Sequence, residues 1–139
     1  MLTLDEANTI VRAAITRAEQ FNIRVAVAVC DQQGHLIALN RMDGAHVTVD
    51  RFAVGKAVLS AGTGAPSNAG AALDINSTVG VVVGSGMPLI RIRGGLPIIR
   101  AGRVEGACGV DGSLVTNQDE DCARAGIAAL QPVVHLVSE

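Results

Sequence analysis

The chain has 139 residues, a formal net charge of −2 and 49% hydrophobic residues, enough for one domain with a substantial core. No apolar run reaches the roughly 18 residues of a membrane helix, and no signal-peptide pattern opens the chain, so we expect a cytoplasmic protein with no membrane partner. Two Phe are the only aromatic residues and no basic block occurs, which argues against nucleic-acid binding.

The N-terminal part predicts a helix followed by a β-hairpin. Apolar residues recur at three- and four-residue spacing over residues 3–20, and Thr3 with Glu6 fits a capping box. RVAVAVC, residues 24–30, then reads as a strand. DQQG supplies a turn, and HLIALN, residues 35–40, reads as the returning strand.

A second helix is predicted from about Thr48, a plausible N-cap, to Ser60. One of its faces is apolar except for one position, and its other side also carries Val54 and Val58, so we expect it to be buried on two sides. The exceptional position is Lys56. The apolar face is formed by Val49, Phe52, Ala53 and Ala57.

The remainder predicts a loop, several strands and a closing helix. Residues 60–77 read as a Gly/Ala/Ser-rich loop with one helical turn near 69–73, and 79–83 and 87–92 read as strands. Residues 95–110 predict a hairpin that turns at 101–103.

Residues 117–130 predict the closing helix, which Asn117 would cap with Glu120 three positions on. Its inward face is expected to carry Cys122, Ala125, Gly126 and Ala129. The element order indicates one α+β domain over residues 1–139, with an antiparallel sheet covered by helices. The apolar surplus further suggests subunit interfaces, so we expect a homo-oligomer.

Lys56 is the first candidate for chemistry, because an ammonium on an apolar face is costly without a partner. It can extend to the rim of the core and reach water. Alternatively, it enters a pocket, where it pairs with Asp43 or an anionic ligand, or acts as a base with a pKa lowered by burial.

Three residues near the start of the second helix are also candidates. Arg41 is suited to bidentate binding of a carboxylate, from a ligand or from Asp43 of a neighbour. Asp43–Gly44 equally suits a plain turn. His46 can ligate a metal or haem iron or transfer a proton, although a lone histidine is commonly a surface residue.

In RIRGGLPI, residues 91–98, Arg91 and Arg93 would lie on the same side of a strand and favour an anionic ligand. Gly94 and Gly95 would let the backbone approach a ligand and cradle an anion, or form a bulge or tight turn. Asp111 is expected at an exposed turn, where it either caps the turn or acts chemically. The three cysteines have no zinc-ligand spacing and are expected in the core.

These segments resemble the GlcG/HbpS family, also called the haem-degrading or DUF336 domain and found at the C-terminus of PduO-type proteins. The resemblance covers nearly the whole chain. It is carried by the opening helix, AVAVCDQQGHLIALNRMDGA, Lys56–Ala57, GGLPI, and GACGVDG with the following QDEDCARAGIAAL. Two features differ from the usual family pattern: Asp111 stands where serine is usual, and Val58–Leu59–Ser60 follows Lys56–Ala57 where a Thr–Ala pair is frequent.

The resemblance implies a profilin-like fold, with a central antiparallel sheet flanked by helices on both faces, and assembly into dimers or larger homo-oligomers. It also implies a binding protein for haem or a related tetrapyrrole. In this hypothesis His46 is the axial iron ligand and binds metal only through haem, and Arg41, Lys56 or Arg93 meets the propionates.

The alternative is a catabolic enzyme that acts on a small carboxylate by acid–base chemistry, as an isomerase or a hydratase-type lyase. Arg41, Arg91 or Arg93 would then hold the carboxylate, and Lys56, His46 or Asp111 would move the proton.

Overall fold

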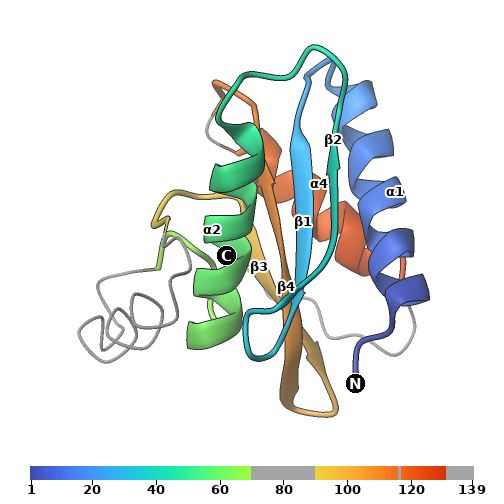
Figure 1. The fold of residues 1–139 in the computed structure, drawn as a ribbon, viewed down its shortest axis with the longest axis vertical. Helices are drawn as coiled ribbons and strands as arrows, with labels where there is room; N and C mark the ends of the chain where they lie inside the picture. Colours follow the sequence, from blue (N-terminus) through green and yellow to red (C-terminus); the bar gives the residue numbers. More distant parts are fainter. Residues whose placement is uncertain (70–89, 116, 131–139) are drawn as a thin grey trace.

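The structure, a computed structural model, describes residues 1–69, 90–115 and 117–130. The order of elements in these ranges is α1 (Leu4–Gln20), β1 (Ala26–Asp31), β2 (Leu36–Arg41), α2 (Val49–Thr63), β3 (Gly95–Arg100), β4 (Arg103–Asp111) and α4 (Gln118–Ala128). The strands form one antiparallel sheet in the order β2-β1-β4-β3. Helix α2 covers one face of the sheet, and α1 and α4 cover the other (Figure 1). The predicted α+β class and the two flanking helical layers are confirmed.

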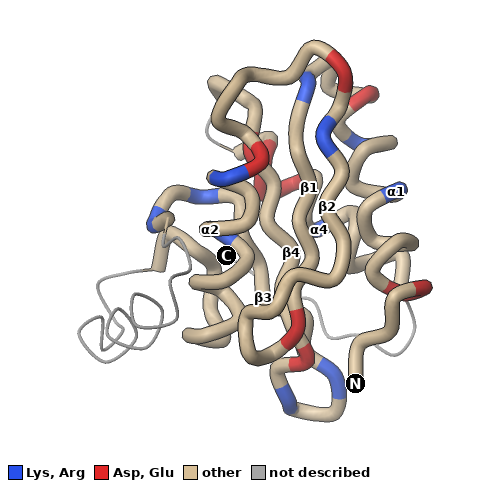
Figure 2. Tube along the Cα trace, in the orientation of Figure 1, with Lys and Arg blue, Asp and Glu red and all other residues tan. Residues whose placement is uncertain are grey.

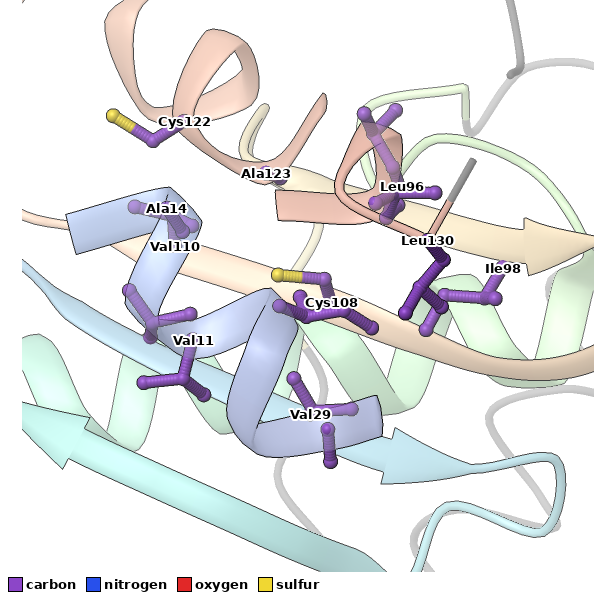
Figure 3. Packing of buried hydrophobic residues seen from close by; sticks show 14 of the residues in the cluster. Val11, Ala14, Val29, Leu96, Ile98, Cys108, Val110, Cys122, Ala123 and Leu130 are labelled. Carbon is purple, nitrogen blue, oxygen red and sulfur yellow. The ribbon is translucent and has the colours of Figure 1, made fainter. Parts of the chain in front are cut away.

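Strand β1 shows how the sequence divides the interior between the two faces. Alternate side chains of a strand point to opposite faces. Val27 and Val29 therefore enter the larger core under α1 and α4, which also contains Val11, Cys108 and Ile127 (Figure 3). The intervening small residues of β1 face α2 and join a separate cluster made mostly of alanine. These residues are Ala26, Ala28 and Cys30.

Helix α2 packs unusually close to the sheet, because small residues line the contact. A Cβ at Gly109 of β4 would lie 2.1 Å from the Ala53 carbonyl oxygen, so only glycine fits beneath the helix there. Every residue from 55 to 61 is buried, in agreement with the prediction that this helix is covered on more than one side. The helix extends to Thr63, past the predicted end at Ser60.

Helix α1 begins as predicted. The Thr3 hydroxyl accepts from the Glu6 amide at 3.1 Å, and Glu6 Oε1 accepts from the Thr3 amide at 3.0 Å, which completes the capping box. Thr48 and Asn117 occupy the N-cap positions of α2 and α4 as predicted, but neither side chain caps its helix. Thr48 and Asn117 both have αR backbone angles and make no capping bond, and Asn117 Oδ1 instead accepts from Arg93 at 2.7 Å.

Two further predictions need correction. The buried face of α4 differs from the predicted inward face. Cys122 and Gly126 are buried, but Ala125 is only half-buried and Ala129 is exposed. Residues 90–94 are not a strand, so Arg91 and Arg93 do not share a strand face. The rest of the predicted 87–92 strand, the 79–83 strand, and most of the helical turn near 69–73 lie outside the described residues.

Charged residues occur along the helices and loops and also at the β3–β4 turn (Figure 2). Arg100 of β3 is the centre of a network near that turn. It pairs with Glu6 of α1 and with Glu105 of β4, the latter at 3.1 Å. Hydrogen bonds from Arg100 and from the Thr3 amide lower the pKa of Glu6 from about 4.5 to about 2.

We predict that Gly109→Ala lowers the free energy of unfolding by about 3 kcal/mol, because the new methyl group must displace the α2 backbone. Gly102→Ala is the control. It lies in the β3–β4 turn at φ +73° with open space around it, so only backbone strain of about 1 kcal/mol is expected. Urea unfolding of both variants measures the difference, and equal losses would contradict the close packing of α2.

The lowered pKa of Glu6 predicts a pH-dependent loss of stability. The folded protein binds a proton at Glu6 less tightly than the unfolded chain does, so this contribution is complete above about pH 4.5 and disappears as pH falls toward 2. Glu6→Gln should flatten the pH dependence of urea unfolding in that window, because the glutamine side chain does not titrate there. Its amide oxygen can still accept from the Thr3 amide, so the cap is kept. The control Glu19→Gln, on the exposed end of α1, should retain the wild-type slope.

Candidate functional site

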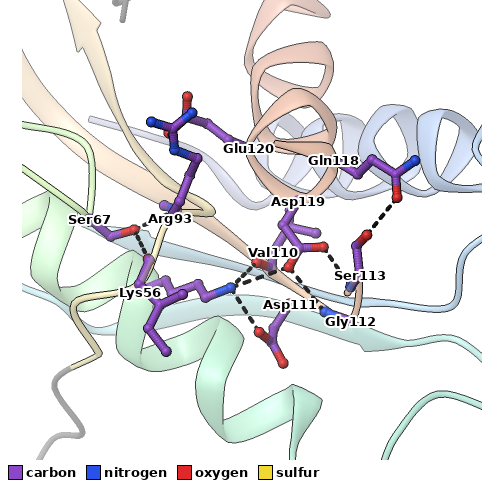
Figure 4. A network of polar contacts seen from close by, with 12 residues as sticks. Lys56, Ser67, Arg93, Val110, Asp111, Gly112, Ser113, Gln118, Asp119 and Glu120 are labelled. Atoms are coloured by element: carbon purple, nitrogen blue, oxygen red, sulfur yellow. Dashed lines mark hydrogen bonds and ion pairs between the residues drawn. The ribbon is translucent and has the colours of Figure 1, made fainter. Parts of the chain in front are cut away.

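Lys56 is the centre of the site. Its side chain leaves the middle of α2 and is only 1% exposed. The ammonium donates to the Val110 carbonyl oxygen at 2.9 Å, to Asp111 Oδ1 at 2.8 Å and to Asp119 Oδ2 at 3.4 Å (Figure 4). An ammonium has three N–H donors. All three therefore have acceptors within the chain.

Glycine at position 94 makes this path possible. Gly94 has φ +138°, and a Cβ there would lie 2.8 Å from Lys56 Nζ and 2.4 Å from the Val110 carbonyl oxygen. Gly95 is equally constrained, since its Cβ would lie 2.4 Å from the Lys56 carbonyl oxygen. The lysine thus passes through space that any side chain at 94 would fill. The Gly94–Gly95 pair serves close packing around Lys56.

Asp119 binds Lys56 from the first turn of α4 and also holds the end of β4. Its Oδ1 accepts from the Ser113 amide at 2.9 Å and its Oδ2 from the Gly112 amide at 3.3 Å. Burial raises the pKa of Asp119, while the charge of Lys56 and the Ser113 amide act in the opposite direction. The carboxylate therefore links α2, the β4 end and α4 through one side chain.

A second buried carboxylate follows it. Glu120 is 1% exposed and pairs with Arg124 one turn later at 3.3 Å and with Arg93 at 3.9 Å. Arg93 also donates to Asn117 Oδ1 at 2.7 Å. The segment before β3 is thereby held against the start of α4, beside the Lys56 contacts (Figure 4).

A pocket of about 390 Å³ opens at this junction. We call it the Lys56 pocket. It is lined by Lys56, Asn68, Ile92, Arg93, Asp111, Ser113, Leu114, Val115 and Asp119. Its apolar rim is formed by Ile92, Leu114 and Val115, which are large hydrophobic residues exposed to solvent. Charged groups on the wall and apolar groups on the rim suit a small amphipathic molecule.

The structure places some predicted site residues together and separates others. Lys56, Asp111 and Arg93 line one pocket. The pairing of Lys56 with Asp43, one of the alternatives drawn from the sequence, is wrong, because Asp43 is exposed in the loop before α2 and Lys56 pairs with Asp111 and Asp119. Sequence reasoning missed Asp119 and Glu120 as site residues. Acidic residues in a first helical turn are normally explained by the helix dipole, so spacing alone gave no signal of their burial.

The Arg41–His46 loop forms a different location. Arg41 donates through Nη2 to the carbonyl oxygens of Ala45 and His46, which fixes the loop, and the His46 residue is exposed. Neither Arg41 nor His46 lines the Lys56 pocket. Arg91 is exposed as well.

Gly95 has its amide engaged inside the chain. It donates to Ser67 Oγ at 2.9 Å, and Ser67 in turn donates to the Ile92 carbonyl oxygen. Ser67 thus fixes the turn that carries Ile92 and Arg93 to the pocket. The Gly95 amide already has an acceptor here, so an anion would have to displace Ser67 to reach it.

The three cysteines are free and buried, as predicted. Burial raises the pKa of Cys30 to about 12 and that of Cys122 to about 12, and it raises the pKa of Cys108 as well. The thiols therefore stay neutral, as core groups. Within the described ranges, no three His, Cys, Asp or Glu side chains are arranged to hold a metal ion. None of the helices described there has both the length and the apolar character needed to cross a bilayer.

Comparison with known proteins gives consistent matches. Residues 2–128 match the family described as haem degrading protein HbpS-like. Protein GlcG of Escherichia coli K12 is 32% identical over 110 residues, which cover 79% of this chain and 81% of GlcG. An uncharacterized 15.0 kDa protein from the dhaT-dhaS intergenic region of Citrobacter freundii is 32% identical, covering 82% of each chain.

Solved structures show the same fold. A crystal structure of a Streptomyces reticuli HbpS double mutant is 29% identical, with a TM-score of 0.79 over 94% of this chain and 88% of that one. The DUF336 protein ORFY of Klebsiella pneumoniae is 26% identical, with a TM-score of 0.76 over 91% of this chain and 88% of that one. A PduOC–haem complex, at 24% identity and a TM-score of 0.79 over 99% of each chain, supports the fold alone.

The buried lysine predicts a large effect of its removal. Lys56→Met should lower the free energy of unfolding by about 3–5 kcal/mol, because Asp111 and Asp119 lose their common cation. Lys56→Met with Asp119→Asn should regain part of this loss. Arg51→Met, on the exposed side of the same helix, is the control and should change stability by less than about 0.5 kcal/mol. If urea unfolding gave Lys56→Met the stability of Arg51→Met, the buried network would be refuted.

Proposed function

The chain belongs to the HbpS-like family of haem-degrading proteins, and on this premise we propose that it is a small-molecule-binding protein that uses the Lys56 pocket. The observation that carries the proposal is the pocket itself, in which buried charged groups meet an exposed apolar rim. Its volume of about 390 Å³ lies within the range of small-molecule sites.

The pocket is held in shape before any ligand enters. Ser67 fixes the turn that carries Ile92, and Asp119 fixes the amides of Gly112 and Ser113 on the opposite wall. Lys56 lies between the two walls, where it packs against Gly94 and donates to Asp119. A site that is ordered in advance loses less conformational entropy on binding, which favours a specific ligand.

Haem is the ligand that the family description raises, so its fit to these residues matters. The described lining of the Lys56 pocket contains no His, Cys or Met to bind iron. Its two cations, Lys56 and Arg93, already pair with carboxylates of the chain. The described residues of the pocket therefore do not fit an iron porphyrin with its propionates.

The loop before α2 offers a possible iron ligand, which the described lining of the Lys56 pocket lacks. There the exposed His46 is linked to Arg41, whose Nη2 donates to the His46 carbonyl oxygen at 3.2 Å. We propose His46 as the axial ligand and Arg41 as the cation for a propionate, in a haem site outside the Lys56 pocket. Bound haem would supply iron-centred redox chemistry, and the chain would supply its ligand and its orientation.

Acid–base catalysis has less support from the geometry. All three Lys56 protons are donated to acceptors, so the residue has no lone pair with which to take a proton from a substrate. Both Asp119 oxygens are also occupied. Asp111 is the remaining acid that lines the pocket, and its carboxylate would need a second group to complete a proton transfer.

Self-association, a cytoplasmic location and a single domain remain predictions of the sequence. For self-association we note one supporting feature, the exposed Leu36 and Leu39 of strand β2. This strand is at the edge of the described sheet, and an apolar edge strand is a surface that a second chain can cover.

A haem titration of metal-free protein tests the haem proposal. We expect a saturable, shifted Soret band at stoichiometric haem that is lost in His46→Ala. His35→Ala is a matched control, since His35 is also exposed but pairs with Asp31 at 3.4 Å, and it should retain the band. Absorbance identical to free haem throughout would overturn the haem site and leave small-molecule binding at the Lys56 pocket to be tested separately.

A further inference from the structure

The hydrogen-bonding state of the Lys56 pocket indicates which chemical class of ligand it takes. The inference rests on the proposed function of the pocket as a binding site. The cations of the pocket have partners already. Lys56 donates to Val110, Asp111 and Asp119, and an ammonium has no fourth proton to offer.

Arg93 is engaged on several sides as well. Its Nη1 donates to Asn117 Oδ1 at 2.7 Å and its Nε lies 3.9 Å from Glu120 Oε2. With the Asn68 amide turned so that its oxygen faces the guanidinium, that oxygen accepts from Arg93 Nη2 and Nε at 3.2 Å. A carboxylate ligand would have to displace a partner to reach Lys56, and at Arg93 it would compete with Glu120 and with the amide oxygens of Asn117 and Asn68.

The group left available is an acceptor. Asp111 lines the pocket with its side chain 18% exposed, and only its Oδ1 is bonded to Lys56. Within the described ranges, Asp111 Oδ2 accepts from no group. With both carboxylates ionised, the four charged residues that line the pocket, Lys56, Arg93, Asp111 and Asp119, have a net charge of zero, so the lining has no excess positive charge to attract an anion, and its unbonded acceptor is Asp111 Oδ2.

The rim adds the second half of the specificity. Ile92, Leu114 and Val115 line the same pocket and expose apolar surface. Burying such surface favours a ligand with a short apolar part. We propose that the Lys56 pocket binds a small amphipathic molecule whose polar end is a hydrogen-bond donor, an ammonium or a hydroxyl group, received by Asp111 Oδ2. This differs from the anionic ligand that the arginines suggest from the sequence.

Three four-carbon probes with different head groups test this proposal: butylammonium, butan-1-ol and butyrate. Each is titrated into the ¹⁵N-labelled full chain while the backbone amides of Ile92, Gly112, Ser113 and Val115 are followed by NMR. We expect saturable shifts with butylammonium, weaker binding of butan-1-ol, and no saturable shifts with butyrate.

Asp111→Asn should weaken butylammonium binding about tenfold or more, because a charge-assisted hydrogen bond is lost. It should affect butan-1-ol less, since an amide oxygen still accepts from a hydroxyl group. Asp43→Asn removes an exposed carboxylate outside the pocket and should change neither affinity. Ile92→Ser leaves the ion pairs intact and should weaken both ligands, which keeps the proposal testable if Asp111→Asn fails to fold.

The outcomes separate the ligand class from the pocket. Tightest binding of butyrate at these amides, or unchanged butylammonium affinity in Asp111→Asn, would overturn the donor class while retaining the pocket as a binding site. If none of the three probes shifted these amides, both the ligand class and the proposed use of the pocket as a binding site would be refuted.

Discussion

The structure depends on one buried ammonium. Lys56 projects from α2 on one side of the sheet, and its acceptors lie at the end of β4 and at the start of α4 on the other side. Removing a charge from water costs several kcal/mol, and only a complete set of close acceptors offsets that cost. The site geometry follows from this constraint. Gly94 and Gly95 must lack side chains, and Asp119 must be buried.

This arrangement also determines what the pocket can offer a ligand. A lysine in a pocket suggests anion binding or base catalysis when it is considered alone. Here the partners of Lys56 occupy its donors, so the polar character of the pocket comes from Asp111. Asp111 is therefore the residue that we expect to determine ligand class.

The sequence allowed much of the fold to be predicted. Periodicity identified the helices α1, α2 and α4, both hairpins and the capping box, because each depends on residues close together in the chain. It also identified Lys56 as an exception on an apolar face. Its acceptors were not identified, because Asp111 and Asp119 lie 55 and 63 positions away and are brought to it by packing.

Local rules failed where a tertiary contact competed with them. Asn117 has the residue type of a helix cap, yet its oxygen is taken by Arg93. Asp119 and Glu120 have the positions of dipole-stabilising acids, yet both are buried in ion pairs. The Gly pair has the composition of an anion cradle, yet it makes room for Lys56. All of these misreadings fall at the contact between α2, β3 and α4.

Lys56 is the only lysine in the sequence, and this permits a direct measurement of its state. Labelling with ¹⁵N-lysine places one side-chain nitrogen in the NMR spectrum, without overlap from other lysines. We predict a charged –NH₃⁺ signal at neutral pH whose protons exchange slowly with water, because the group is buried and bonded to three acceptors. A signal that exchanges as fast as that of free lysine, or that shows a neutral amine, would contradict the account.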